Sequence, residues 1–273
     1  MEPLQLSLPR RMLWVVAVAL LVICAWFTRL DAEATQLADD GLKRALISFA
    51  TARTLNAVIS VAQGTEVAVQ PAGVGLTFTP GQVLDPLNDL VEQFSDLMLI
   101  ASVSFGVQKV LISIGAYWLI PWMLTITAGL WAIFYLRQQH SSPWLTRALM
   151  ILLLVRFAIP VVTVSTDVLF QKFMATDYRS SQQAITSASG DLGKLSTPIP
   201  QPQAKKGVLD RITGWWSENM DVKLRYEQLK QTAEQAIEHI VRLMAIFLLQ
   251  TLLLPVLLMW LLYGLARKAF EWT

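Results

Sequence analysis

The sequence predicts an all-α integral membrane protein, in which four transmembrane helices extend into a long helical extracytoplasmic bundle with one small β-hairpin. The 273 residues are 54% hydrophobic and 15% charged, whereas a soluble domain usually carries about 25% charged residues. The apolar residues collect in four segments that are long enough to cross a bilayer. The segments between them repeat apolar residues at four- and three-residue steps, which is typical of helices that pack together.

The composition excludes several classes of protein. Disordered chains are poor in apolar residues and rich in charge, so this chain is expected to be ordered. A net charge of +2 gives no support to nucleic-acid binding, because domains that bind nucleic acid are usually strongly basic. Cys24 is the single cysteine, which excludes a disulfide framework and a Cys-rich zinc site. No cofactor is expected.

Each predicted span falls within the roughly 17–25 residues that a helix needs to cross the hydrocarbon core. Arg156 is the one charged residue within them. The first span is followed by bulky residues rather than by a small-residue cleavage site, so we expect it to be retained as a signal anchor. The predicted spans are 12–28, 118–136, 148–166 and 243–263.

Basic residues flank these spans on one side of the membrane. They indicate that both termini and the loop between the second and third spans face the cytoplasm, because short cytoplasmic segments are enriched in Lys and Arg. The chain is therefore predicted to be a multi-pass protein of the bacterial inner-membrane type, with lipid as a partner. The predicted cytoplasmic segments are 1–11, 137–147 and 264–273, and the extracytoplasmic ones are 29–117 and 167–242.

Residues 97–117 are apolar enough to form a fifth span. Lys109 and the serines and glycines around it favour a helix that packs against protein instead. A fifth crossing would also place the basic loop 137–147 outside, against the positive-inside rule. We therefore predict an outer or interfacial helix that bends near 115–121 into the second span.

Long helices are expected in both extracytoplasmic segments. Two shorter pieces interrupt them: residues 65–79 alternate in hydrophobicity and predict a β-hairpin, and residues 186–207 are rich in Ser, Pro, Gly and Gln and predict a linker. Gly190 is the expected end of the helix that follows the third span. In the helix at 31–62, the predicted packing positions are Ala38, Leu42, Ala45, Phe49, Ala52, Asn56 and Ile59.

Arg156 is the sharpest functional signal, because an intramembrane charge is costly and is by default a candidate functional residue. No acidic residue lies within the four spans to neutralise it. One interpretation is a water-lined positive site for an anion; the other is an Arg held by threonines, Gln250 or free carbonyls of the bundle. Gln250 and Thr251, with Pro255 beyond them, are a second candidate for a polar cavity, although helix–helix hydrogen bonding is the commoner role.

Three further features of the sequence are candidates for a functional role. Lys109 shares a helical face with Ser102, Gly106 and Ser113, and this face either lines an oligomeric vestibule or packs against a neighbouring helix. Trp215 and Trp216 either form a docking surface for a partner or are buried within the bundle. The acidic cluster Asp31, Glu33, Asp39 and Asp40 is interpreted as a solvated helix face beside the membrane.

Two function hypotheses follow, and neither is an enzyme. The first is an oligomeric channel or pore with anion preference, since rings of basic side chains select anions. The alternative is a non-conducting scaffold or accessory subunit that binds a protein partner through its extracytoplasmic helices. This organisation is similar to that of large-pore channels and tetraspan scaffolds, a likeness of fold that does not fix function. Glu234, Glu238 and His239 lie close enough on one helix to hold a metal, but a surface cluster is favoured, so no metal site is predicted.

Overall fold

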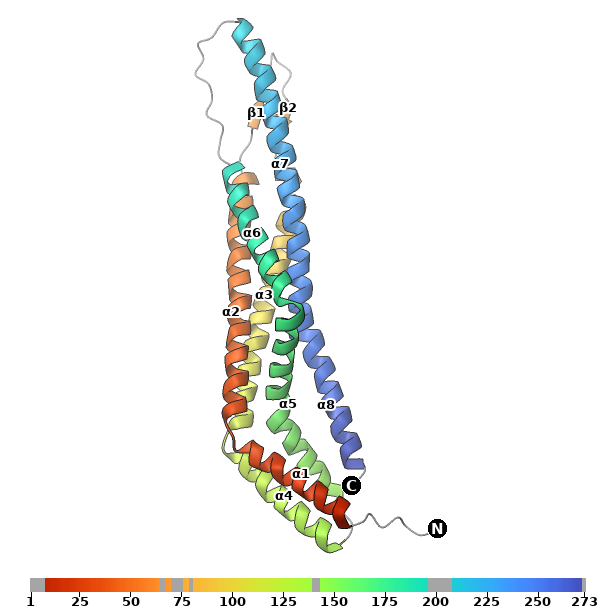
Figure 1. Cartoon of the computed structure of the whole chain (residues 1–273). Coiled ribbons are helices and arrows are strands. Elements are labelled where there is room, and N and C mark those ends of the chain that lie inside the picture. Colours follow the sequence, from red (N-terminus) through yellow and green to blue (C-terminus); the bar gives the residue numbers. More distant parts are fainter. Residues whose placement is uncertain are drawn as a thin grey trace, which may run out of the picture. The chain divides into compact units, whose positions relative to one another are not determined.

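The computed structural model describes residues 8–63, 67–69, 76–78, 81–138, 143–195 and 208–271. These residues are almost entirely helical, as Figure 1 shows. In chain order the elements are α1 (Leu8–Ala25), α2 (Arg29–Gln63), β1 (Val67–Val69), β2 (Leu76–Phe78), α3 (Gly81–Ala116), α4 (Leu119–Gln138), α5 (Pro143–Phe173), α6 (Ala175–Leu195), α7 (Val208–Leu248), the π-helical turn η1 (Leu249–Leu253) and α8 (Leu254–Glu271).

The chain divides into two compact units. The first unit consists of Met1–Lys43, Val103–Lys172 and Leu249–Thr273, and the second consists of Arg44–Ser102 and Phe173–Leu248. Helices α2 and α3 contribute residues to both units. Each unit has its own buried residues and is described by itself below.

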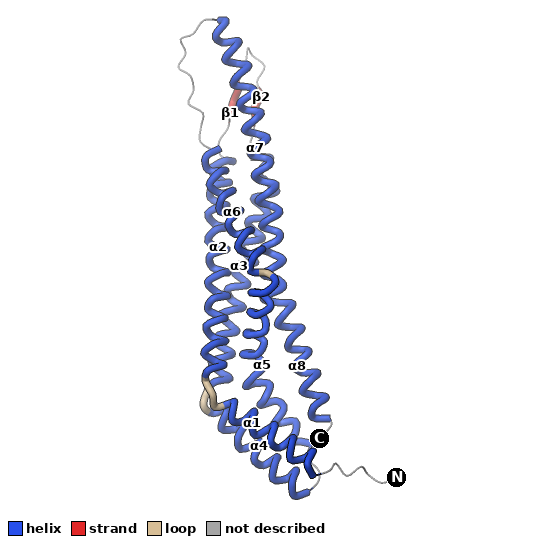
Figure 2. The backbone as a smooth tube through the Cα atoms, in the orientation of Figure 1, coloured by secondary structure: helices blue, strands red, loops and turns tan. Residues whose placement is uncertain are grey.

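The helix at the N-terminal end is interrupted where an unbroken helix was expected. Helix α1 ends at Ala25 and α2 begins at Arg29, so the predicted span 12–28 is too long at its C-terminal end. A second short loop at 117–118 separates α3 from α4, and Figure 2 shows both loops in tan. The Trp26 ring lies edge-on to Trp122 with centroids 5.5 Å apart, and its Nε1–H donates a 3.2 Å hydrogen bond to Thr125 Oγ1.

Five described helices are long and apolar enough to cross a membrane by length and composition: Arg29–Gln63, Leu84–Ala116, Leu119–Arg137, Pro143–Phe173 and Glu227–Ala269. Met12–Ala25, the apolar part of α1, is shorter than these five helices. This is the set of helices expected of an all-α, multi-pass membrane protein. The predicted count of four spans is not confirmed. Two helices within the range predicted to be extracytoplasmic, Arg29–Gln63 and Leu84–Ala116, are themselves long and apolar enough, and the predicted first span is not among the five.

The first unit is held together by large apolar side chains from several helices. Helices α1 and α4 lie side by side (Figure 1). Between them and α5, the Trp131 ring stacks on Tyr135 with centroids 4.9 Å apart. This cluster buries Val18, Ala25, Leu124, Ala128, Trp131, Tyr135, Leu145 and Leu149. A smaller cluster joins α2, α3 and α5 through Ala34, Ala38 and Ile112, with Ile159 and Val164 against it.

Among the described residues, most of the large apolar side chains that are exposed lie on the first unit, and fewer lie on the second. On α3 the exposed residues Val103, Val107, Val110 and Ile114 recur at helical spacing along one face. A contiguous apolar surface of this size is rare on soluble proteins. It is the surface that a helix presents to lipid.

The second unit is a helical bundle with a core of small and medium side chains. The prediction for α2 is right at Ala45, Ala52 and Ile59, which are buried. It is wrong at Leu42, Phe49 and Asn56, which are only half-buried; Gly41, Ser48 and Leu55 are buried in their places. Every second packing position is therefore displaced by one residue, because a seven-residue repeat allows a step of either three or four residues between its packing positions and the neighbouring helices fit the three-residue step. Ser48 Oγ donates a 2.9 Å hydrogen bond to Gln182 Oε1 on α6.

The expected end of α6 and the expected linker are wrong in part. Helix α6 continues through Gly190 to Leu195, so the beginning of the range 186–207 is helical. Leu192 is fully buried and extends the packed face of Ile185 and Ala188, which stabilises the helix beyond the glycine. The rest of the range, 196–207, lies outside the described residues.

Two short strands lie within the range 65–79. Strands β1 and β2 are antiparallel, with Val67 opposite Phe78 and Val69 opposite Leu76. Residues 70–75, between the two strands, lie outside the described residues.

Substituting Gly41 and Gly106 by Ala should have opposite effects on stability. A Cβ on Gly41 would overlap the ring of Phe105, which is buried, whereas a Cβ on Gly106 would meet nothing within 4 Å. We expect Gly41→Ala to lower the free energy of unfolding by about 1–3 kcal/mol through overpacking. Gly106→Ala should raise it by up to about 1 kcal/mol, because Ala is the better helix former. Thermal unfolding in detergent micelles measures both, and equal effects of the two substitutions would contradict this packing.

Candidate functional site

Arg156 lies in the middle of α5 and is buried by residues from three other helices. Its side chain is 2% exposed. Helix α3 approaches α5 closely here, because the position of a Cβ on Gly115 lies 3.1 Å from the Val155 carbonyl oxygen. The centroid of the Phe157 ring lies 5.5 Å from Arg156 Cζ. The guanidinium group is therefore removed from water and needs partners within the protein.

Asp31 is the charged partner of Arg156. Arg156 Nη1 donates to Asp31 Oδ1 at 2.6 Å, and Nη2 donates to Oδ2 at 2.7 Å. The carboxylate lies in the first turn of α2, where the positive end of the helix dipole also favours a negative charge. This two-pronged arrangement is the strongest geometry for an Arg–carboxylate pair.

The Ala25 carbonyl oxygen completes the site. Arg156 Nε and Nη2 donate to it at 3.1 and 2.9 Å. Ala25 is the last residue of α1, so its carbonyl has no partner within the helix. Arg156 thus binds the C-terminal end of α1 and the N-terminal turn of α2 at once, and this explains how the chain breaks at 26–28 in apolar surroundings.

One sequence-based expectation about this site is incomplete and another is wrong. A free carbonyl, that of Ala25, holds Arg156 as one interpretation expected, but an acid from outside the predicted spans neutralises it as well. Asp31 is buried, at 7% exposed, rather than part of a solvated acidic face. The signal that points to Asp31 is its position, just beyond the first span, combined with the rule that a buried Arg is almost always paired.

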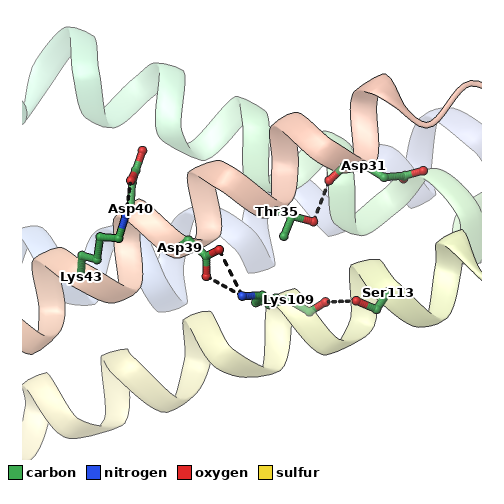
Figure 3. Close-up of polar contacts among 7 residues, drawn as sticks. All are labelled: Asp31, Thr35, Asp39, Asp40, Lys43, Lys109 and Ser113. Carbon is green, nitrogen blue, oxygen red and sulfur yellow. Dashed lines mark hydrogen bonds and ion pairs between the residues drawn. The ribbon is translucent and has the colours of Figure 1, made fainter.

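Lys109 also has an acidic partner within the chain, as Figure 3 shows. Its Nζ lies 2.8 Å from Asp39 Oδ1 and 3.1 Å from Oδ2, and so joins α3 to α2. The two side chains remain 45% and 34% exposed. Nearby, Asp40 pairs with Lys43 on its own helix (Figure 3). On the face shared with Lys109, a Cβ on Gly106 would meet open space, so that glycine is not a point of close helix approach.

Gln250 and Thr251 lie in the π-helical turn η1, apart from Arg156. Pro255 has no N–H to donate to the Thr251 carbonyl, which accounts for a local departure from α-helical hydrogen bonding. Gln250 is buried, and its Oε1 accepts no hydrogen bond from the described residues. Among those residues the polar partners of Arg156 are Asp31 and Ala25, so the structure does not join the two candidates into one site.

Trp215 and Trp216 lie in the N-terminal part of α7. Their side chains lie outside what the structure describes, so neither docking nor burial of the rings is tested. Helix α7 has 41 residues and its neighbour α6 has 21. The end of α7 that carries both tryptophans runs past the end of α6 (Figure 1).

The acids around His239 are engaged separately. Glu234 pairs with Lys230 at 3.9 Å and Glu238 with Arg242 at 3.0 Å. His239 Nδ1 lies 3.2 Å from Ser181 Oγ on α6. Within the described ranges, no three His, Cys, Asp or Glu side chains are grouped as metal ligands.

Comparison with protein-family models, curated proteins and solved structures finds no match to this chain.

The Arg156–Asp31 pair predicts a large stability effect that the Lys109–Asp39 pair does not share. Arg156→Gln or Asp31→Asn leaves one buried charge unpaired and should lower the free energy of unfolding by about 3–5 kcal/mol. Replacing both, as Arg156→Met with Asp31→Leu, should recover most of this loss. Lys109→Gln and Asp39→Asn should each cost at most about 1 kcal/mol, because that pair is solvated. Calorimetry of the purified variants measures these free energies of unfolding. If the single variants at both pairs lost only a little stability and the losses added up in the double variants, Arg156 would not be buried with Asp31.

Proposed function

We propose that this protein is a non-conducting membrane scaffold or accessory subunit, anchored by its first unit and binding a partner through its second. The observation that carries this proposal is the pairing of Arg156 with Asp31 and of Lys109 with Asp39. These were the two cations expected to attract an anion. Each is neutralised within one chain, so neither leaves the net positive charge that an anion-selective path requires.

The surfaces of the first and second units differ, which supports a different role for each unit. Exposed Leu, Val, Ile and Trp side chains cover much of the first unit, as on Trp260, which is 75% exposed. Among the described residues, the second unit exposes fewer large apolar side chains than the first, Ile100 and Phe173 among them. It pairs surface acids with Lys230 and Arg242. The first surface suits lipid, and the second suits water, which is the division that an anchored binding domain needs.

Trp215 and Trp216 are the proposed partner-binding residues. They lie in the N-terminal part of α7, and this end of the helix runs past α6 (Figure 1). Tryptophan is enriched among the few interface residues that contribute most of the binding energy. A helix end with two adjacent tryptophans therefore gives the partner a compact apolar contact.

Crosslinking in cells followed by purification tests this proposal. We expect a second protein in fixed stoichiometry with this chain. Substituting both Trp215 and Trp216 by Ala should weaken its binding at least about tenfold, because interface tryptophans often contribute 2 kcal/mol or more. Trp260→Ala is the matched control and should leave binding unchanged. Recovery of only copies of this chain would contradict the scaffold.

An oligomeric channel is the second candidate, and Gln250 favours it. A buried side-chain oxygen without a partner is uncommon in native proteins, and π-helical turns often occur at functional sites. In this proposal several copies would surround a path that passes the η1 turns. The channel would not owe any anion preference to Arg156.

Planar bilayer recordings separate the two candidates. The scaffold predicts no conductance from folded, purified protein. If the protein conducts, Gln250→Leu should alter the conductance whereas Lys194→Gln, at an exposed site on the second unit, should not. Conductance that depends on Gln250 would replace the scaffold with the channel, and reversal potentials in a salt gradient would then measure its ion preference.

A further inference from the structure

The first unit contains an apolar groove between three helices. Its volume is about 390 Å³, and its lining side chains are apolar or aromatic. Trp14 and Ala17 line it from α1, Met150 and Phe157 from α5, and Leu262 and Ala266 from α8. Ligand pockets usually measure about 300–1,000 Å³, so the groove is large enough to hold part of a small molecule.

The groove exists because small side chains face it from every wall. Ala17, Ala158, Ala266 and Ala269 lie among its lining residues. An alanine fills less space than the leucines and valines beside it, so the three helices leave the groove open between them. Since every wall is apolar, the groove suits a hydrocarbon chain rather than a polar solute.

Basic residues collect at one end of this groove. Trp14, Met150 and Ala269 all line it, so the N-terminal ends of α1 and α5 and the C-terminal end of α8 lie together there (Figure 1). Arg147 precedes Met150 by one helical turn on the same face of α5 and is exposed, as is Lys268 next to Ala269. Arg10 and Arg11 occupy the first turn of α1. Among the described residues, the only acid near this end is Glu271.

We propose that the groove binds an acyl chain of an anionic phospholipid, with the phosphate of that lipid beside Arg147 and Lys268. Charge complementarity selects this occupant, because basic pockets between membrane helices bind anionic headgroups. The apolar walls account for the tail and the basic end for the head, so one ligand satisfies both. The site does not depend on partner binding or on conductance.

Native mass spectrometry of the full chain, released from nanodiscs of equal parts phosphatidylglycerol and phosphatidylcholine, tests the proposal. We expect phosphatidylglycerol to be retained preferentially. Arg147→Gln and Lys268→Gln should each reduce this preference about fivefold. Lys194→Gln, a basic residue of the second unit, should leave it unchanged.

Filling the groove gives an independent test. Ala17→Phe should remove the retained lipid of either headgroup, whereas Ala19→Phe should not, because Ala19 is exposed on the same helix and does not line the groove. Ala266→Phe fills the groove from α8 and should reproduce Ala17→Phe, which separates a blocked groove from a misfolded variant. Inorganic phosphate should not displace the lipid, since it lacks the chain that the groove holds.

Several outcomes would overturn the proposal. Equal retention of the two lipids by the unmodified chain would remove the role of the basic end. Equal effects of Ala17→Phe and Ala19→Phe would remove the role of the groove. A change from oligomer to monomer in Ala17→Phe, with lipid retention unchanged, would show that a second copy of the chain occupies the groove. Displacement by phosphate alone would show a simple anion site.

Discussion

The buried contact of Arg156 with Asp31 and the Ala25 carbonyl is the interaction on which the first unit depends. It meets three requirements in one place: a cation in apolar surroundings, a carbonyl left free at the end of α1, and an acid in the first turn of α2. Any one of these groups would be costly alone. Together they use four N–H···O bonds, which hold the end of α1 to the first turn of α2 across the break at 26–28.

This contact also restricts what the charges of the protein can do. A pair such as Arg156–Asp31 adds little net stability compared with well-packed apolar residues, but removing one partner is expensive. Such a pair therefore specifies one arrangement of α1, α2 and α5 rather than attracting a ligand. Lys109 and Asp39 repeat the arrangement at a solvated position. The candidates for a functional surface are then the apolar face of the first unit with its groove, and the proposed partner-binding end of α7.

Helical periodicity in the sequence predicted where helices form but less well which residues pack. Ala45, Ala52 and Ile59 were placed correctly, because a seven-residue repeat marks one face whatever the neighbour is. Between them, Phe49 was expected inside and Ser48 is there instead. Which of these two residues is buried depends on how the neighbouring helices pack against α2, and the sequence of one helix does not specify that packing. The same limit applies to α6, where burial of Leu192 carries the helix through Gly190.

The sequence by itself determined the class of fold, the positions of the main helices and the unusual character of Arg156. These follow from local properties: apolar run length, repeat spacing and the cost of a charge in an apolar segment. Only the tertiary structure decided the partner of Arg156, since Asp31 lies 125 residues away in the chain. The pair forms where the helix breaks at 26–28 and where α3 approaches α5 closely at Gly115. Both are properties of packed helices in three dimensions, and no spacing within the sequence encodes them.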